Sequence, residues 1–240
     1  MRLSQGARVS AERDEGRPLL PTRAVAGALA LVLVCLPILN AHIVLPWTLD
    51  GVEPDRRVRW WLDIGFLVVS HACIVATCIG AVRLQGRDIS DIGLTRRHRV
   101  RWLLGLFAVG AIALIGVQLR RLGVLDMSAD PRPIDPHSTL ERSVFAIEGL
   151  FVGACQEVMW RGFGIRGLMA WPRVGTMTAV AVTSISFGYY HGGLTQQPLG
   201  ALIALTLVGA LLAALYLWRR DLWPALFLHA SFNAIGAVFL

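Results

Sequence analysis

Seven long apolar stretches constrain this 240-residue chain more than any other feature of its sequence. A helix needs about 20 apolar residues to cross the ~30 Å hydrocarbon core of a bilayer. An isolated strand there would leave its backbone groups without hydrogen-bond partners. We therefore predict an all-α, polytopic integral membrane helix bundle with about seven transmembrane helices, approximately at 24–46, 60–82, 102–119, 143–168, 174–192, 198–218 and 222–240.

Composition supports this prediction. Hydrophobic residues make up 55% of the chain and charged residues 16%, whereas an average soluble domain carries about 25% charge. The mean hydropathy is +0.58. A chain of this size cannot hide so much apolar surface in a soluble core, so most soluble enzymes and nucleic-acid-binding proteins are excluded. Membrane lipids are its expected surroundings.

The 23 basic residues are all arginines, and the net charge is +7. A basic chain often binds nucleic acid, but these arginines divide unevenly between the two ends of the predicted spans. With the N-terminus inside, the inner segments hold 16 arginines and the outer loops hold 7. The positive-inside rule then favours a cytoplasmic N-terminus and an outer C-terminus, with no nucleic-acid partner.

The predicted domain organisation is simple. Residues 1–23 are polar and form a cytoplasmic N-terminal tail, and 24–240 form a single transmembrane helical domain. The first span is too long for the core of a signal peptide and has no evident cleavage site, so we expect it to be uncleaved. The absence of lysine, with abundant Ala, Gly, Val and Leu, indicates a GC-rich bacterial genome and hence a bacterial inner membrane.

The fourth predicted span carries ionisable side chains, which are rare inside membranes and mark functional sites. Glu157 and Arg161 would each cost about 2.5–3.5 kcal/mol near a helix centre. They stand at i and i+4 with the acid first, the favoured order for an ion pair within a helix. Gln156 lies about 100° round the helix and is free to face a cavity. Glu148, near the outer interface, is expected to pack or to snorkel.

Two further spans offer polar side chains one helical turn apart. Phe187 and His191 end the fifth span, and His229 and Asn233 lie in the seventh. A carboxylate with a histidine can activate water, and a histidine with an asparagine can donate hydrogen bonds to an oxyanion. Glu157, His191 and His229 are alternatively the ligands of a zinc site with an open fourth position. Apart from that zinc ion, the sequence indicates no cofactor.

Other polar or aromatic residues have simpler explanations. His42 and His71 have no motif partner, so each is expected to be a satisfied interhelical hydrogen-bonding residue. Tyr189 and Tyr190 fit either an aromatic belt or a substrate groove. The four cysteines lie in apolar runs and indicate no disulfide framework.

Three motifs resemble those of the CPBP intramembrane proteases. This family includes type II CAAX prenyl endopeptidases and bacterial proteins linked to bacteriocin processing, immunity or abortive infection. Its motifs, Glu-Glu-x-x-x-Arg, Phe-x-x-x-His and His-x-x-x-Asn, stand here in order as Gln156-Glu157-Val-Met-Trp-Arg161, Phe187-Gly-Tyr-Tyr-His191 and His229-Ala-Ser-Phe-Asn233. The stretches Asp91-Ile-Gly-Leu-Thr-Arg96 and Leu222-Trp-Pro-Ala are also typical, so the resemblance covers about residues 88–240.

The resemblance implies hydrolysis of a peptide bond inside the membrane, in a lipidated or membrane-embedded peptide. It implies that the residue at position 156 and His191 activate the attacking water, and that His229 and Asn233 stabilise the oxyanion. The other motif residues, Glu157, Arg161 and Phe187, would then orient and support the helices. Family members were long called metalloproteases, although the type II CAAX enzymes look like glutamate-dependent enzymes without a catalytic metal.

The sequence departs from the family at the first Glu, which is Gln156 here. Glutamine has nearly the shape of glutamate but cannot accept a proton as a base or carry the charge of a metal ligand. Three explanations remain open. The substitution was introduced to inactivate the protein, the natural protein is a pseudoprotease used for binding or immunity, or Glu157 acts as the base after leaving Arg161.

The linear order of the spans creates a geometric difficulty. His191 falls near the outer end of its span, whereas Glu157 is central or nearer the inside. At 1.5 Å per residue the mismatch is on the order of 10 Å. A shared site therefore requires an oblique or short fifth helix, or a buried segment after His191.

Overall fold

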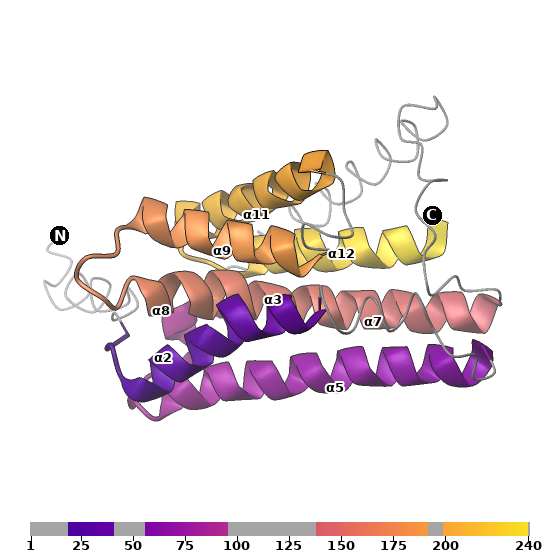
Figure 1. Cartoon of the computed structure of the whole chain (residues 1–240), viewed down its shortest axis with the longest axis horizontal. Helices are drawn as coiled ribbons and strands as arrows, with labels where there is room; N and C mark the ends of the chain where they lie inside the picture. The colour runs from indigo at the N-terminus through magenta and orange to yellow at the C-terminus, as the bar shows by residue number, and fades with distance from the viewer. Residues whose placement is uncertain (1–18, 41–55, 96–137, 192–198, 240) are drawn as a thin grey trace, which may run out of the picture.

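The computed structural model describes residues 19–40, 56–95, 138–191 and 199–239, which form helices and turns without a strand. Six helical rods lie side by side along the long axis of the molecule (Figure 1). Their elements are α2 (Arg23–Ala30), the π-helix η1 (Leu31–Cys35), α3 (Leu36–Leu39), α5 (Arg56–Arg83), the 3₁₀-helix η3 (Ile89–Ile92), α7 (Thr139–Glu157), the π-helix η4 (Val158–Ile165), α8 (Arg166–Leu168), α9 (Thr176–Tyr190), α11 (Leu199–Arg219) and α12 (Trp223–Phe239). The predicted all-α class is confirmed for this part of the chain.

The rods run in two opposite directions (Figure 1). The first rod (α2 to α3), α9 and α12 point one way, and α5, α7 and α11 point the other way. The parallel course of α5 and α7 fits the predicted span at 102–119 between them, although that span lies outside the described residues. The N-terminal tail and His42 also lie outside them.

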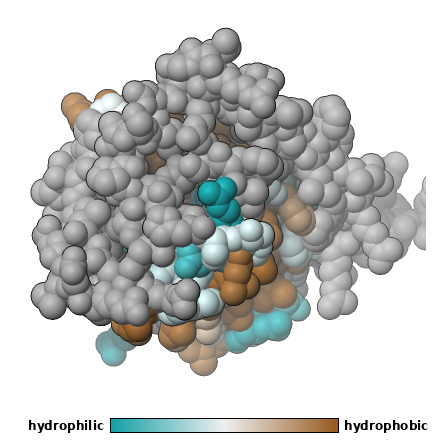
Figure 2. Space-filling view, turned by 90° about the vertical axis from the view of Figure 1, so that its right-hand side faces the viewer, coloured by the Kyte–Doolittle hydropathy of each residue, from teal (hydrophilic) through white to brown (hydrophobic). Residues whose placement is uncertain are grey.

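Two of the described helices are long and apolar enough to cross a membrane, Trp60–Arg83 and Leu199–Trp218, while the apolar helix Arg23–Leu39 is shorter. Only 28% and 22% of the two apolar windows are buried. Large apolar side chains such as Val69 and Leu207 are exposed instead. In Figure 2, brown hydrophobic surface is visible where described residues are not covered by grey ones. A core helix of a soluble protein has the reverse arrangement. The count of seven spans stays a prediction.

Close helix contacts at glycines bring the motif-bearing helices together. A Cβ atom on Gly153 of α7 would lie 2.8 Å from Cα of Ala230, so α12 could not approach α7 this closely beside a larger residue. A Cβ atom on Gly209 of α11 would lie 3.1 Å from Cα of Ser184 on α9. Small residues therefore set the spacing of α7 with α12 and of α9 with α11.

The end of the bundle where α12 begins joins the two short stretches that are typical of the family. Leu222 N donates to Gly93 O at 2.9 Å, and Trp223 Nε1 donates to Thr95 O at 2.7 Å. Gly93 has a φ of 96°, and a Cβ atom there would lie 2.6 Å from Cε2 of Tyr216, so this turn requires glycine. The turn after η3 is thus fastened to the start of α12, the helix that carries His229.

The fourth rod begins where its sequence provides a cap and changes its winding at the motif. The Ser138 hydroxyl accepts from Glu141 N at 3.1 Å and starts α7. The rod ends at Leu168, as predicted, but residues 158–165 are wound as a π-helix. π-helical turns are rare and often occur at functional sites. The sequence pattern did not indicate this change of winding directly after Glu157.

Candidate active site within the helix bundle

A single carboxylate oxygen lies at the centre of the polar cluster in the bundle. Glu157 Oε1 lies 2.9 Å from Arg161 Nη1 and accepts from His229 Nδ1 at 2.7 Å. The side chains of Glu157 and Arg161 are 0% and 1% exposed, and His229 is also buried. The other carboxylate oxygen, Oε2, is buried and has no hydrogen-bond partner among the described residues. The predicted ion pair is therefore present, and it also holds a histidine from α12.

Arg161 links three of the helical rods through one guanidinium. Besides the ion pair with Glu157, its Nη2 donates to Gly209 O on α11 at 3.2 Å. The guanidinium carbon lies 4.2 Å from the centroid of the Phe187 ring on α9, a cation–π contact. Breaking one of these contacts would leave a buried charge with fewer partners, so Arg161 fixes α9 and α11 relative to the Glu157–His229 pair.

Phe187 brings the second and third motifs together. Its ring centroid is 4.4 Å from that of His191 and 5.4 Å from that of His229. His191 Nδ1 donates to Phe187 O at 2.8 Å, which leaves Nε2 of that imidazole as the atom with the lone pair. The two imidazoles therefore lie against one aromatic ring, next to the Glu157–Arg161 pair.

The short α9 removes the geometric difficulty of the linear order. α9 has 15 residues and ends at Tyr190, with His191 as its C-cap. Asn40, at the end of the first rod, donates from Nδ2 to Tyr190 O at 2.6 Å and ties down that end of α9. A full-length span would have placed His191 farther from the level of Glu157.

Asn233 lies one turn beyond His229, on the side of α12 that packs against α7. A Cβ atom on Gly149 would lie 3.2 Å from Cβ of Asn233, and one on Gly153 would lie 3.1 Å from its Nδ2. The glycines of α7 therefore give this amide the space beside the helix that carries Glu157.

Gln156 faces a different neighbour from Glu157. Its Nε2 lies 3.4 Å from Nε2 of His71 on α5, and the Tyr190 hydroxyl lies 3.1 Å from the same histidine nitrogen. All three side chains are buried. His71 does form interhelical hydrogen bonds, as expected, and one of its two interhelical partners is the residue at the substituted motif position. Glu148, which is 6% exposed, packs inside the bundle rather than snorkelling.

A zinc ion held by Glu157, His191 and His229 does not fit this arrangement. Glu157 Oε1 already forms an ion pair with Arg161 and accepts a hydrogen bond from His229 Nδ1. Within the described ranges, no three His, Cys, Asp or Glu side chains lie close enough to hold a metal ion. We therefore derive no reaction step through a metal.

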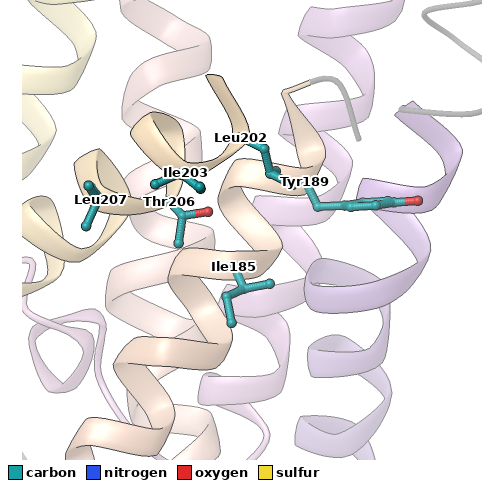
Figure 3. Close-up of a pocket in the computed structure, with 6 residues that line it drawn as sticks. All are labelled: Ile185, Tyr189, Leu202, Ile203, Thr206 and Leu207. Atoms are coloured by element: carbon teal, nitrogen blue, oxygen red, sulfur yellow. The ribbon is translucent and has the colours of Figure 1, made fainter. Parts of the chain in front are cut away.

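An apolar groove of about 300 Å³ lies between α9 and α11 (Figure 3). It is lined by Ile185, Tyr189, Leu202, Ile203, Thr206 and Leu207. Tyr189 thus lines a groove, whereas Tyr190 is buried and contacts His71. The groove is on the face of α9 that carries Ile185 and Tyr189, and the polar cluster is on the face that carries Phe187.

Over the described residues, these features define an all-helical bundle with exposed apolar surface and a buried polar site. Residues 139–235 match the family model described as type II CAAX prenyl endopeptidase Rce1-like. This match agrees with the resemblance to the CPBP family, whose members are integral membrane proteins, and the two long apolar helices fit a membrane location. No curated protein and no solved structure matches the chain.

The contacts that the sequence did not reveal are those between helices. His71 is recognisable as an ionisable residue in a span, but no pattern in the sequence indicates that it contacts Gln156. The same holds for Ser186, which accepts from Trp160 Nε1 at 3.0 Å and donates to Leu33 O in η1 at 2.9 Å. The only sequence feature that could have indicated these contacts is the presence of hydrogen-bonding side chains in the other spans.

Proposed function

We propose that this chain is an intramembrane endopeptidase that hydrolyses a peptide bond in a lipidated or membrane-embedded peptide. The observation that carries the proposal is the buried network of Glu157, Arg161 and His229 beside His191, within the Rce1-like segment. A bundle built only for stability does not need such a network, because apolar residues of similar volume are often as stable or more stable. Its presence therefore supports a chemical role.

Four side chains divide the chemistry in this proposal. His191 accepts a proton from the attacking water at Nε2, since its Nδ1 already donates to Phe187 O, and passes that proton to the leaving amine as the C–N bond breaks. Gln156 orients that water and accepts no proton. His229 and Asn233 donate hydrogen bonds to the carbonyl oxygen as it becomes an oxyanion. Because Nδ1 of His229 is committed to the Glu157 carboxylate, His229 donates from Nε2 as an imidazolium.

The arginine distribution and the absence of lysine support a bacterial inner membrane with the N-terminus in the cytoplasm. Membrane lipids and a peptide substrate are the proposed partners. One alternative function has a specific observation in its favour. Gln156 cannot act as a base, which favours a non-catalytic membrane protein that keeps the scaffold for binding or bacteriocin immunity.

Cleavage assays on purified full-length protein in lipid test the proposal. The substrates are a prenylated CAAX-type peptide and an unlipidated transmembrane peptide, each with the unchanged protein, Gln156→Glu and His191→Ala. Cleavage by the unchanged protein that is lost in His191→Ala supports the proposed roles. Cleavage only by Gln156→Glu shows an enzyme inactivated at position 156. No cleavage by the unchanged protein or by Gln156→Glu, with the fold intact, supports the binding protein and contradicts the proposal.

A further inference from the structure

We infer that His71 on α5 is a further positioning residue of this site, and that its imidazole makes glutamine, not glutamate, the matching residue at position 156. α5 lies outside the segment 139–235 that matches the family model. The inference rests on the proposed endopeptidase function only for its kinetic test. The contacts that support it are independent of that function.

The backbone of α5 fixes the tautomer of His71. Its Nδ1 lies 2.8 Å from Leu67 O, and a carbonyl oxygen can only accept, so Nδ1 carries the proton. Nε2 is then a hydrogen-bond acceptor in the neutral ring. This atom is the one that lies 3.1 Å from the Tyr190 hydroxyl and 3.4 Å from Gln156 Nε2. His71 is 0% exposed, so bulk water does not compete for this acceptor.

An acceptor at this place distinguishes glutamine from glutamate. The amide of Gln156 donates to His71 Nε2 and shares its lone pair with the Tyr190 hydroxyl, whereas a carboxylate at position 156 has no proton to donate. Two acceptors would then face each other in a buried site, or His71 would have to take up a proton. Glutamine avoids both costs. The motif substitution and the histidine on α5 therefore form a complementary pair.

The pair is placed to influence the proposed catalytic groups through Tyr190. The Tyr190 ring centroid is 5.9 Å from that of His71 and 5.0 Å from that of His191. The Trp160 ring centroid lies 5.2 Å from that of Tyr190. By contacting both the Gln156 amide and the Tyr190 hydroxyl, His71 fixes Gln156 together with Tyr190, the side chain that flanks His191. His71 acts through these two residues and does not itself touch the reacting atoms in this assignment.

A stability comparison tests the pairing without any activity. Thermal unfolding is measured for the full-length protein, Gln156→Glu, His71→Gln and the double variant. Gln156→Glu alone is expected to unfold at a lower temperature. His71→Gln is expected to be tolerated and to restore much of the loss in the double variant, because a glutamine at position 71 can either accept or donate. Thr77→Val is the control, since Thr77 is exposed on the same helix and bonds only to Cys73 O in the described contacts.

A kinetic comparison tests the positioning role. His71→Leu removes the acceptor and is expected to lower kcat on the order of tenfold, with a smaller change in KM. His71→Gln keeps an acceptor and is expected to retain most of the turnover. Equal loss in both variants would show that the imidazole itself takes part in proton transfer and would overturn the positioning role, as would unchanged turnover in His71→Leu.

The two proposals fail in different ways. If the unchanged protein cleaves no substrate, the endopeptidase proposal fails while the unfolding temperatures still report on the pairing. If Gln156→Glu is as stable as the unchanged protein, or if the effects at positions 71 and 156 are additive, the pairing is wrong whatever the activity. Additivity is the result expected for residues that do not interact.

Discussion

At the residue scale, the cost of a buried arginine explains the arrangement around Glu157. Arg161 is 1% exposed, so the Glu157 carboxylate, the Gly209 carbonyl and the Phe187 ring must together replace its water. The same carboxylate oxygen also orients His229. The stability of the protein and the orientation of His229, a proposed oxyanion donor, therefore both depend on Glu157 Oε1.

Glu157→Gln is expected to destabilise the protein by about 3–5 kcal/mol, because it leaves the buried Arg161 charge without its counter-ion. The measurement is thermal or denaturant unfolding in detergent. The double variant Glu157→Leu with Arg161→Leu is the matched comparison, and it should recover much of the loss because no buried charge remains. If the double variant lost as much stability as Glu157→Leu and Arg161→Leu lose in sum when each is made alone, this explanation would be contradicted.

Phe187→Leu is expected to lower both stability and turnover. The change removes the ring that faces the Arg161 guanidinium, a contact worth up to about 2 kcal/mol when desolvated, and it widens the space between His191 and His229. The control is Phe232→Leu, since Phe232 is 56% exposed on α12. Unfolding temperature and kcat report the two effects. Similar behaviour of both variants would show that Phe187 acts only as apolar volume.

Residue pairs within one helix were predictable from sequence, and pairs between helices were not. Glu157 and Arg161 stand one turn apart, so their spacing alone predicted the ion pair. The contact of Gln156 with His71 joins positions 85 residues apart and depends on how α5 packs against α7. The family motifs predicted that the three helices share a site, but they contain no information about α5.

At the element scale, glycine contacts control the distance between the motif-bearing helices. Gly153→Ala is expected to destabilise the protein, because the added Cβ would lie 2.8 Å from Cα of Ala230 and push α12, with His229, away from Glu157. Gly80→Ala on α5 is the control, since nothing lies within 4 Å of its added Cβ. Alanine is otherwise about 1 kcal/mol better than glycine in a helix. Gly153→Ala is expected to lower the unfolding temperature and Gly80→Ala to raise it. A shift in the same direction for both variants would contradict this prediction.

Hydropathy predicted the existence and approximate ends of the described helices, but it did not predict how they are wound. η1 and η4 are π-helical, and the Ser186 hydroxyl donates to Leu33 O within η1. Such a hydrogen bond depends on the neighbouring helix, so no local pattern in the sequence indicates it. Hydropathy likewise did not predict the length of α9. The apolar stretch extends to 192, but the helix ends at Tyr190, where Asn40 donates to its carbonyl.

At the scale of the whole molecule, the directions of the rods agree with an alternating membrane topology (Figure 1), but the order of helices does not say which end faces the cytoplasm. The arginine distribution predicts an orientation, because a cytoplasmic N-terminus places 16 arginines at the inner ends and 7 at the outer ends. In this orientation α9 runs outward, and His191 at its C-terminal end lies toward the outer half of the membrane. A substrate would then meet His191 from that side of the bundle.

Reporter fusions in a bacterial host test this orientation. Alkaline phosphatase, which is active only outside the cytoplasm, is expected to be active at the C-terminus and inactive at the N-terminus, and a fluorescent protein that folds only in the cytoplasm should give the opposite result. Replacing Arg83 and Arg87 by glutamate is expected to weaken the preference for a cytoplasmic N-terminus, because it removes positive charge next to α5 on the predicted inner side. Fluorescence from a C-terminal fusion would contradict the cytoplasmic N-terminus. It would also place His191 toward the inner half, so that the peptide substrate approached from the cytoplasmic side.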